Sequence, residues 1–170
     1  MNNQQIPTEI NIGDILRLAL PLSTTVSAGA RHARRNVKWV VLLTSWDDLE
    51  DQVEQGDLLI IPPVLEQQTT TESLLDILDK VVELEVAGML VFKEVLEIVA
   101  EKASALNLPL LVAPPGISVR DAHQAIVFLL ADRQAATTER GMQLYRKLSE
   151  MSREEQGLQA MTDVMSKLTG

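Results

Sequence analysis

Basic side chains crowd one short stretch of an otherwise acidic chain, whose formal net charge is −9. Residues 30–39, ARHARRNVKW, hold five groups able to bind an anion: Arg31, His32, Arg34, Arg35 and Lys38. Nucleic-acid affinity grows with the number of phosphates neutralised, and no helix-turn-helix pattern accompanies these few cations. The acids of residues 47–57 supply countercharge nearby in the chain. We therefore interpret the stretch as a solvated loop with internal ion pairs, and a surface for an acidic partner or ligand as the alternative.

A second group of residues with binding chemistry follows the apolar runs expected to be strands. Parallel sheets bind ligands beyond the carboxyl ends of their strands. The residues expected there, or at the start of the following helix, are Thr44, Ser45, Lys93, Gly116, Ser118 and Arg120. Free N–H groups of the helix that begins at Ser118, together with Lys93 or Arg120, would attract an anion. We interpret this edge as a candidate site for a small-molecule effector; the alternative is that the Pro-Pro pairs there only stiffen the strand exits.

Patterns typical of catalysis or metal binding are missing from the sequence. The two histidines, His32 and His123, are far apart, and the chain has no cysteine. The glycine-rich patterns of nucleotide-binding loops and of nucleophile elbows do not occur. We expect no catalytic residue, no metal site, no cofactor and no enzymatic activity. A small-molecule enzyme with its site at the strand ends is the less favoured alternative.

Composition limits the environment and the partners of the protein. No run approaches the roughly 18 apolar residues that a membrane span requires, and the N-terminus lacks the pattern of a signal peptide. The absence of cysteine fits a reducing compartment. Only 3% of the residues are aromatic, which argues against a stacking surface for single-stranded nucleic acid. We expect a soluble cytoplasmic protein without membrane contact.

Apolar runs and amphipathic patterns alternate along the first part of the chain. Strands are expected within residues 24–28, 36–44, 57–63, 87–92 and 108–116, and helices within 10–20, 45–56, 69–86 and 94–107. The run 36–44 is apolar enough to predict a strand buried on both faces. This alternation predicts an α/β fold: a mostly parallel sheet of about four to five strands flanked by helices, followed by a long C-terminal helix and a short terminal helix.

Capping patterns mark the starts of several of these helices. Asn11 and Asp14 have the spacing of an N-cap and its N3 partner, and so do Ser118 and Asp121. The same spacing is found for Ser45 with Asp48 and for Thr69 with Glu72. We expect helices to begin just after the first residue of each pair.

The pattern of the sequence changes near Ser118. We predict an α/β sensory or regulatory domain over residues 8–117, a long linker and dimerisation helix over 118–151, and the start of a truncated following domain over 152–170. A looser apolar stripe on the long helix needs a covering partner, and a homodimer would supply it. The residues expected at that interface are Leu129, Ala136, Leu144, Tyr145, Leu148 and Met151.

Several stretches resemble the N-terminal portion of purine catabolism regulator (PucR)-type bacterial transcription factors. They are INIGDILRLALPLSTTVSAGARHARRNVKWVVLL, GDLLIIPP, VAGMLVFKE, IVAEKASALNLPLLVAPPGISVRDAHQAI and LYRKLSEMSREEQGLQAMTDVMSKLTG. The chain departs from that pattern at Thr44-Ser45, where the family usually has Ser-Glu, and at Ile61-Pro62-Pro63, where it usually has a Thr-Thr-Gly turn. A more distant likeness links the chain to the N-terminal domain of HPr kinase and to DRTGG domains, which are also regulatory modules.

The resemblance implies a sensory domain that couples a ligand or partner signal, through a dimerising helix, to a DNA-binding domain outside this chain. DNA contact is therefore expected only through that further domain. The alternative function is a stand-alone protein-interaction module, for which the acidic segment 47–57 is the best surface.

Overall fold

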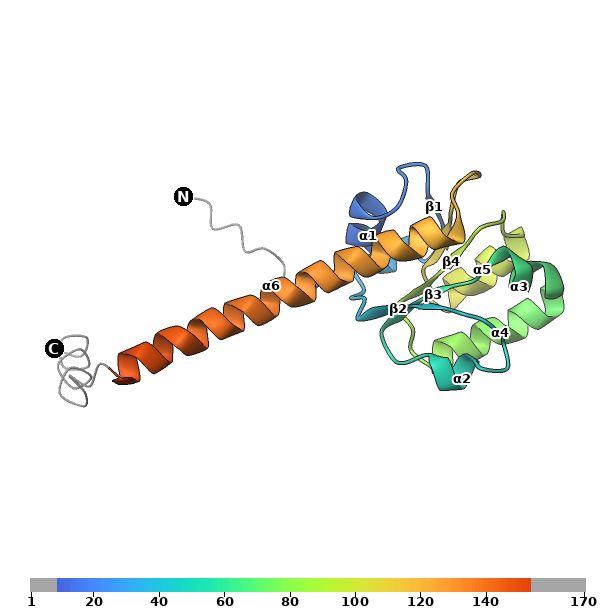
Figure 1. Cartoon of the computed structure of the whole chain (residues 1–170). Coiled ribbons are helices and arrows are strands. Elements are labelled where there is room, and N and C mark those ends of the chain that lie inside the picture. Colours follow the sequence, from blue (N-terminus) through green and yellow to red (C-terminus); the bar gives the residue numbers. More distant parts are fainter. Residues whose placement is uncertain (1–8, 154–170) are drawn as a thin grey trace. The chain divides into compact units, whose positions relative to one another are not determined.

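Five short strands form a single mixed sheet in the computed structural model, which describes residues 9–153 (Figure 1). The strands are β1 Thr25–Ala28, β2 Trp39–Leu42, β3 Asp57–Ile60, β4 Gly88–Val91 and β5 Leu110–Val112. Their order across the sheet is β1-β5-β4-β3-β2. The four strands β2 to β5 are parallel, and β1 pairs antiparallel with β5 at one edge. The predicted α/β fold with a mostly parallel sheet is confirmed.

Helices follow most of the strands. In the described residues they are α1 Ile12–Leu18, α2 Leu49–Gln52, α3 Pro63–Gln68, α4 Thr71–Glu83, α5 Glu97–Ala105 and α6 Val119–Arg153, with a 3-10 turn η1 at Ala30–His32. The long helix expected near the C-terminus is therefore present. The short terminal helix expected within residues 152–170 lies outside the described residues.

The sheet buries apolar side chains on both faces. Because side chains alternate along a strand, Leu59 and Met89 lie in one core with α4 and α5, while Leu58 and Leu90 lie in the other. The second core is closed by α1 and by the first turns of α6, through Ile12, Ile15, Ala122, Ile126 and Leu130. Helices thus cover the sheet on both sides, as parallel strands require.

The chain forms two compact units. The first extends through Arg133, past the domain boundary expected at residue 117, because Ala122, Ile126 and Leu130 belong to the second core. The second unit begins at Gln134, and its described residues continue α6 to Arg153.

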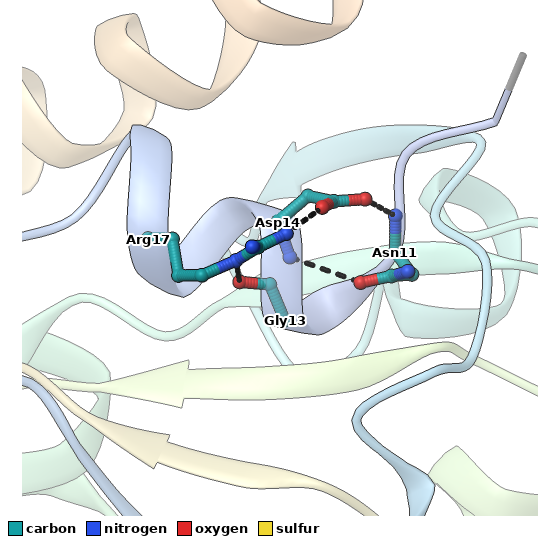
Figure 2. Close-up of polar contacts among 4 residues, drawn as sticks. All are labelled: Asn11, Gly13, Asp14 and Arg17. Carbon is teal, nitrogen blue, oxygen red and sulfur yellow. Dashed lines mark hydrogen bonds and ion pairs between the residues drawn. The ribbon is translucent and has the colours of Figure 1, made fainter. Parts of the chain in front are cut away.

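A capping box starts α1, as the spacing of Asn11 and Asp14 predicts (Figure 2). The Asn11 side chain accepts a hydrogen bond from the Asp14 backbone N–H at 2.9 Å, and the Asp14 carboxylate accepts one from the Asn11 N–H at 3.1 Å. Arg17, one turn later, forms an ion pair with the same carboxylate. The box satisfies N–H groups that would otherwise lack a partner, in a segment that supplies part of the second core.

Four local expectations are wrong. The helix expected to begin after Thr69 has Thr70 as its N-cap, and the Thr70 hydroxyl accepts a hydrogen bond from the Ser73 N–H. The strand expected to be buried on both faces, β2, lies at a sheet edge, and Trp39 is 40% exposed. The helix expected over 45–56 forms only as α2, whose N-cap residue Asp48 makes no side-chain capping bond. The helix α3 was not expected, because its Pro63 stands in a Pro-Pro pair that is typical of a strand exit, although proline is also well suited to a first helical turn.

Candidate functional site

A cleft opens at the carboxyl ends of β3 and β4, where α3, α4 and the segment before α5 meet. Its volume is about 160 Å³, and we call it the Trp46 cleft. Apolar side chains make up most of its wall: Ile61, Leu74, Val91, Val95, Leu96 and Val99. Its polar lining comes from Glu66, Thr69, Thr71, Lys93 and Glu94. A mostly apolar wall with a few polar groups is typical of a small-molecule site.

Glu66, on α3, brings a carboxylate to this cleft. One oxygen, Oε1, accepts a hydrogen bond at 2.8 Å from the backbone N–H of Phe92, which follows β4. The other oxygen, Oε2, is buried and has no hydrogen-bond partner. Buried acceptors without a partner are costly and uncommon in folded proteins. Glu66 therefore lines the cleft with a carboxylate whose second oxygen is covered and has no hydrogen bond from the described residues.

Burial raises the pKa of Glu66, and the Phe92 N–H bond, the charge of Lys93 and the backbone N–H of Lys93 offset part of that effect. A carboxyl whose pKa is higher in the folded state stabilises the fold in its protonated form. That contribution is complete below the ordinary pKa of glutamate and is lost as the pH rises through the raised value. In its ionised form the carboxylate therefore costs stability, unless a ligand pairs with it.

Trp46 closes one side of the cleft and is held in place by hydrogen bonds. Its indole Nε1–H donates to Thr69 Oγ1 at 2.7 Å, and the Thr69 hydroxyl donates to the Leu65 carbonyl at 2.6 Å. The chain after β2 is thereby tied to the end of α3. This arrangement fixes the wall of the cleft before any ligand binds.

Of the six residues predicted to bind a ligand, Lys93 alone is among the lining residues of the Trp46 cleft. Thr44 accepts a hydrogen bond from the Gln52 side chain, and Ser45 accepts one from the Asp47 N–H. Ser118 caps α6, because its hydroxyl accepts from the Asp121 N–H at 3.0 Å as the spacing predicts. Gly116 and Arg120 are exposed on the segment that leads into that helix. The structure thus does not gather the six residues at one place.

Neither Glu66 nor Trp46 is predicted as a site residue from the sequence. Glu66 lies on the unexpected helix α3, and its partner Phe92 is distant in the chain. The one local hint is a tryptophan two residues after the predicted strand 36–44, since a polar tip on an apolar body suits the rim of a pocket.

The basic stretch has a structural role at the amino ends of β4 and β5. The Arg35 guanidinium donates to the carbonyls of Val86 and Asn107, which precede β4 and β5. Ion pairs expected between this stretch and residues 47–57 do not form within 4 Å in the described part of the chain. Burial raises the pKa of Asp57, and the Glu54 N–H and the charge of Lys38 lower it in part. The loop is therefore held by carbonyl contacts rather than by salt bridges.

The predicted dimerisation residues fall into three groups. Leu129 is partly buried and packs against the second core. Leu144 and Tyr145, on the part of α6 in the second unit, are 63% and 73% exposed. The side chains of Ala136, Leu148 and Met151 lie outside what the structure describes.

Two further expectations concern metals and membranes. Within residues 9–153, no cluster of three or more His, Asp or Glu side chains is arranged to hold a metal ion. No helix in the same part of the chain has both the length and the apolar character needed to cross a bilayer.

Comparisons with known proteins show the fold and leave the family open. No family model and no curated protein matches the sequence. A solved structure similar to this chain is that of the CBS and DRTGG domains of the regulatory region of Clostridium perfringens pyrophosphatase, complexed with its activator, diadenosine tetraphosphate. The two share 18% identity with a TM-score of 0.51, over 71% of this chain and 47% of that one. This chain therefore spans less than half of the structure that it matches.

Proposed function

We propose that this chain is a regulatory domain that binds a small-molecule effector in the Trp46 cleft and passes the signal on through α6. The observation that carries the proposal is the half-buried carboxylate of Glu66 in the lining of a largely apolar cleft at the carboxyl edge of a parallel sheet. This geometry supports a binding site, because the hydrogen bonds of Trp46 already hold the wall of the cleft in place.

Two resemblances support a regulatory role over a catalytic one. The sequence resembles the N-terminal portion of PucR-type transcription factors, and the fold is found again in part of a pyrophosphatase regulatory region. On this proposal, a DNA-binding domain outside the chain receives the signal. The diadenosine tetraphosphate bound in the pyrophosphatase structure is far larger than a cleft of about 160 Å³, so we propose a smaller effector here.

Blocking the cleft tests the proposal. A panel of amino acids, amines, nucleobases, nucleotides and sugars is screened for a rise in Tm of the 170-residue chain and of Thr71→Phe, which places a large ring in the cleft. We expect at least one compound to stabilise the wild type, since ligand at a hundredfold excess over Kd adds about 2.7 kcal/mol. The variant should lose that response.

The control for this screen is Glu72→Phe, which adds the same ring to the neighbouring exposed position outside the cleft lining. It should respond as the wild type does. A panel without any stabilising compound, or a response that Thr71→Phe retains in full, would contradict the proposed function.

We further propose that α6 joins two copies of the chain. Met142, Leu144 and Tyr145 are exposed apolar side chains on the described part of the second unit, and a second copy would cover them. Sedimentation equilibrium should show a dimer, and Leu144→Glu should shift it at least tenfold toward monomer, because a charge is then buried in the contact. A wild-type chain that stays monomeric at high micromolar concentration would exclude this interface.

A further inference from the structure

The polar groups of the Trp46 cleft are unequally available to a ligand. The Trp46 indole N–H and the Thr69 hydroxyl are already engaged with each other and with the Leu65 carbonyl. The Phe92 N–H is engaged with Glu66 Oε1. What the lining offers without an ion pair among the described residues is an acceptor group, the Glu66 carboxylate. A complementary ligand must therefore bring a hydrogen-bond donor.

The charges around the cleft favour a cationic donor. Two carboxylates line it, those of Glu66 and Glu94, against the single cation of Lys93. Lys93 is exposed and forms no ion pair with Glu66 within 4 Å in the described part of the chain. A partly buried carboxylate is stabilised most by a partner that both donates a hydrogen bond and carries positive charge. An anionic ligand would instead meet the negative charge of Glu66 in the lining.

The size of the cleft limits the rest of the ligand. An apolar cavity of roughly 150 Å³ holds one benzene molecule, and the Trp46 cleft measures about 160 Å³. Its wall of aliphatic side chains suits a short hydrocarbon body and offers few partners for further polar groups.

We propose that the cleft binds a small amphipathic amine, whose protonated amino group pairs with the Glu66 carboxylate in the lining and whose hydrocarbon body packs on the aliphatic wall. This inference rests on the proposed function, because it assigns a chemical class to the effector of the same cleft. It assigns Glu66 as the residue that selects that class.

Three probes of nearly the same shape test the assignment: isoamylamine, isoamyl alcohol and isovalerate. Binding is followed by the fluorescence of Trp46 in a Trp39→Phe background, where Trp46 is the one remaining tryptophan. A hydrogen bond to a charged group contributes about 1.5–3 kcal/mol, so the amine should bind roughly 10-fold or more tightly than the alcohol. Isovalerate should bind more weakly than either.

Glu66→Gln isolates the carboxylate, since glutamine keeps an oxygen for the Phe92 N–H and removes the charge. The preference for amine over alcohol should fall to within about threefold, while alcohol binding stays the same. The matched control is Glu94→Gln, which removes an exposed charge from the same cleft and should change the preference by less than threefold, because exposed charges are screened.

The possible results distinguish the amine assignment from the proposed function. Equal binding of amine and alcohol, tighter binding of isovalerate, or a preference that survives Glu66→Gln would overturn the amine assignment. If the three probes fail while another compound of the panel stabilises the chain and is blocked by Thr71→Phe, the amine assignment falls and the proposed function stands. If no compound of either set binds, both fall.

Discussion

Replacing Gly29 with alanine should lower the free energy of unfolding by about 3 kcal/mol or more. Gly29 has a φ of 66°, in the left-handed region that alanine rarely adopts. A Cβ built at this position would lie 2.5 Å from the Leu108 carbonyl oxygen and 2.6 Å from the Pro109 nitrogen. These are backbone atoms that lead into β5, so they can move only by disturbing the pairing of β1 with β5. Urea denaturation followed by circular dichroism measures the loss.

Gly116→Ala is the control that separates the two causes. Gly116 also has a positive φ, 94°, but a Cβ there meets nothing within 4 Å. The free energy of unfolding of Gly116→Ala should fall only by the cost of the unfavourable backbone conformation, about 1–2 kcal/mol. If the two variants lose equal stability, the close approach of Gly29 to the chain before β5 contributes nothing, and the argument from packing fails.

Local interactions made part of this fold predictable from the sequence. The caps at Asn11 and Ser118 depend on residues three positions apart, and the bonds found there are those that the spacing predicts. The same spacing at Ser45 and at Thr69 does not mark a cap. The alternation of strand and helix patterns predicted the sheet and its parallel strands for a similar reason, because each crossover is continuous in the chain. The caps and the alternation of strands and helices are both determined by residues that lie close together in the sequence.

Features that depend on distant partners were not predictable. The edge position of β2 follows from the order of all five strands. An apolar sequence does not indicate whether its strand lies at the edge or in the middle of the sheet. The role of Arg35 depends on carbonyls 51 and 72 residues away. Glu66 likewise becomes a site residue only because Phe92, 26 residues on, holds one of its oxygens. The sequence placed a candidate site at the carboxyl edge of the sheet, where the Trp46 cleft also lies, but of its six residues only Lys93 lines that cleft.

The position of α3 shows how one missed element changes the site. A Pro-Pro pair after a strand favours an extended exit, yet Pro63 occupies the first turn of a helix, where its missing N–H costs nothing. That helix delivers both Glu66 and, at its end, Thr69 to the cleft. Without this helix, the cleft would lack the Glu66 carboxylate and the Thr69 hydroxyl that accepts the hydrogen bond of Trp46.

The start of α6 should behave as part of the sheet domain, and Ile126→Ala tests this. Ile126 is fully buried in the second core, so the substitution should cost about 2–5 kcal/mol in the free energy of unfolding. Phe128, two residues on, is 64% exposed, and Phe128→Ala should change stability by less than about 0.5 kcal/mol. Denaturation of the full chain measures both. Because the helix is fixed to the sheet through one narrow stripe of side chains, a shift of that sheet face on effector binding would move the first turns of α6 with it. Near-equal losses for the two variants would mean that these turns are not anchored, and a signal could not enter the helix by this route.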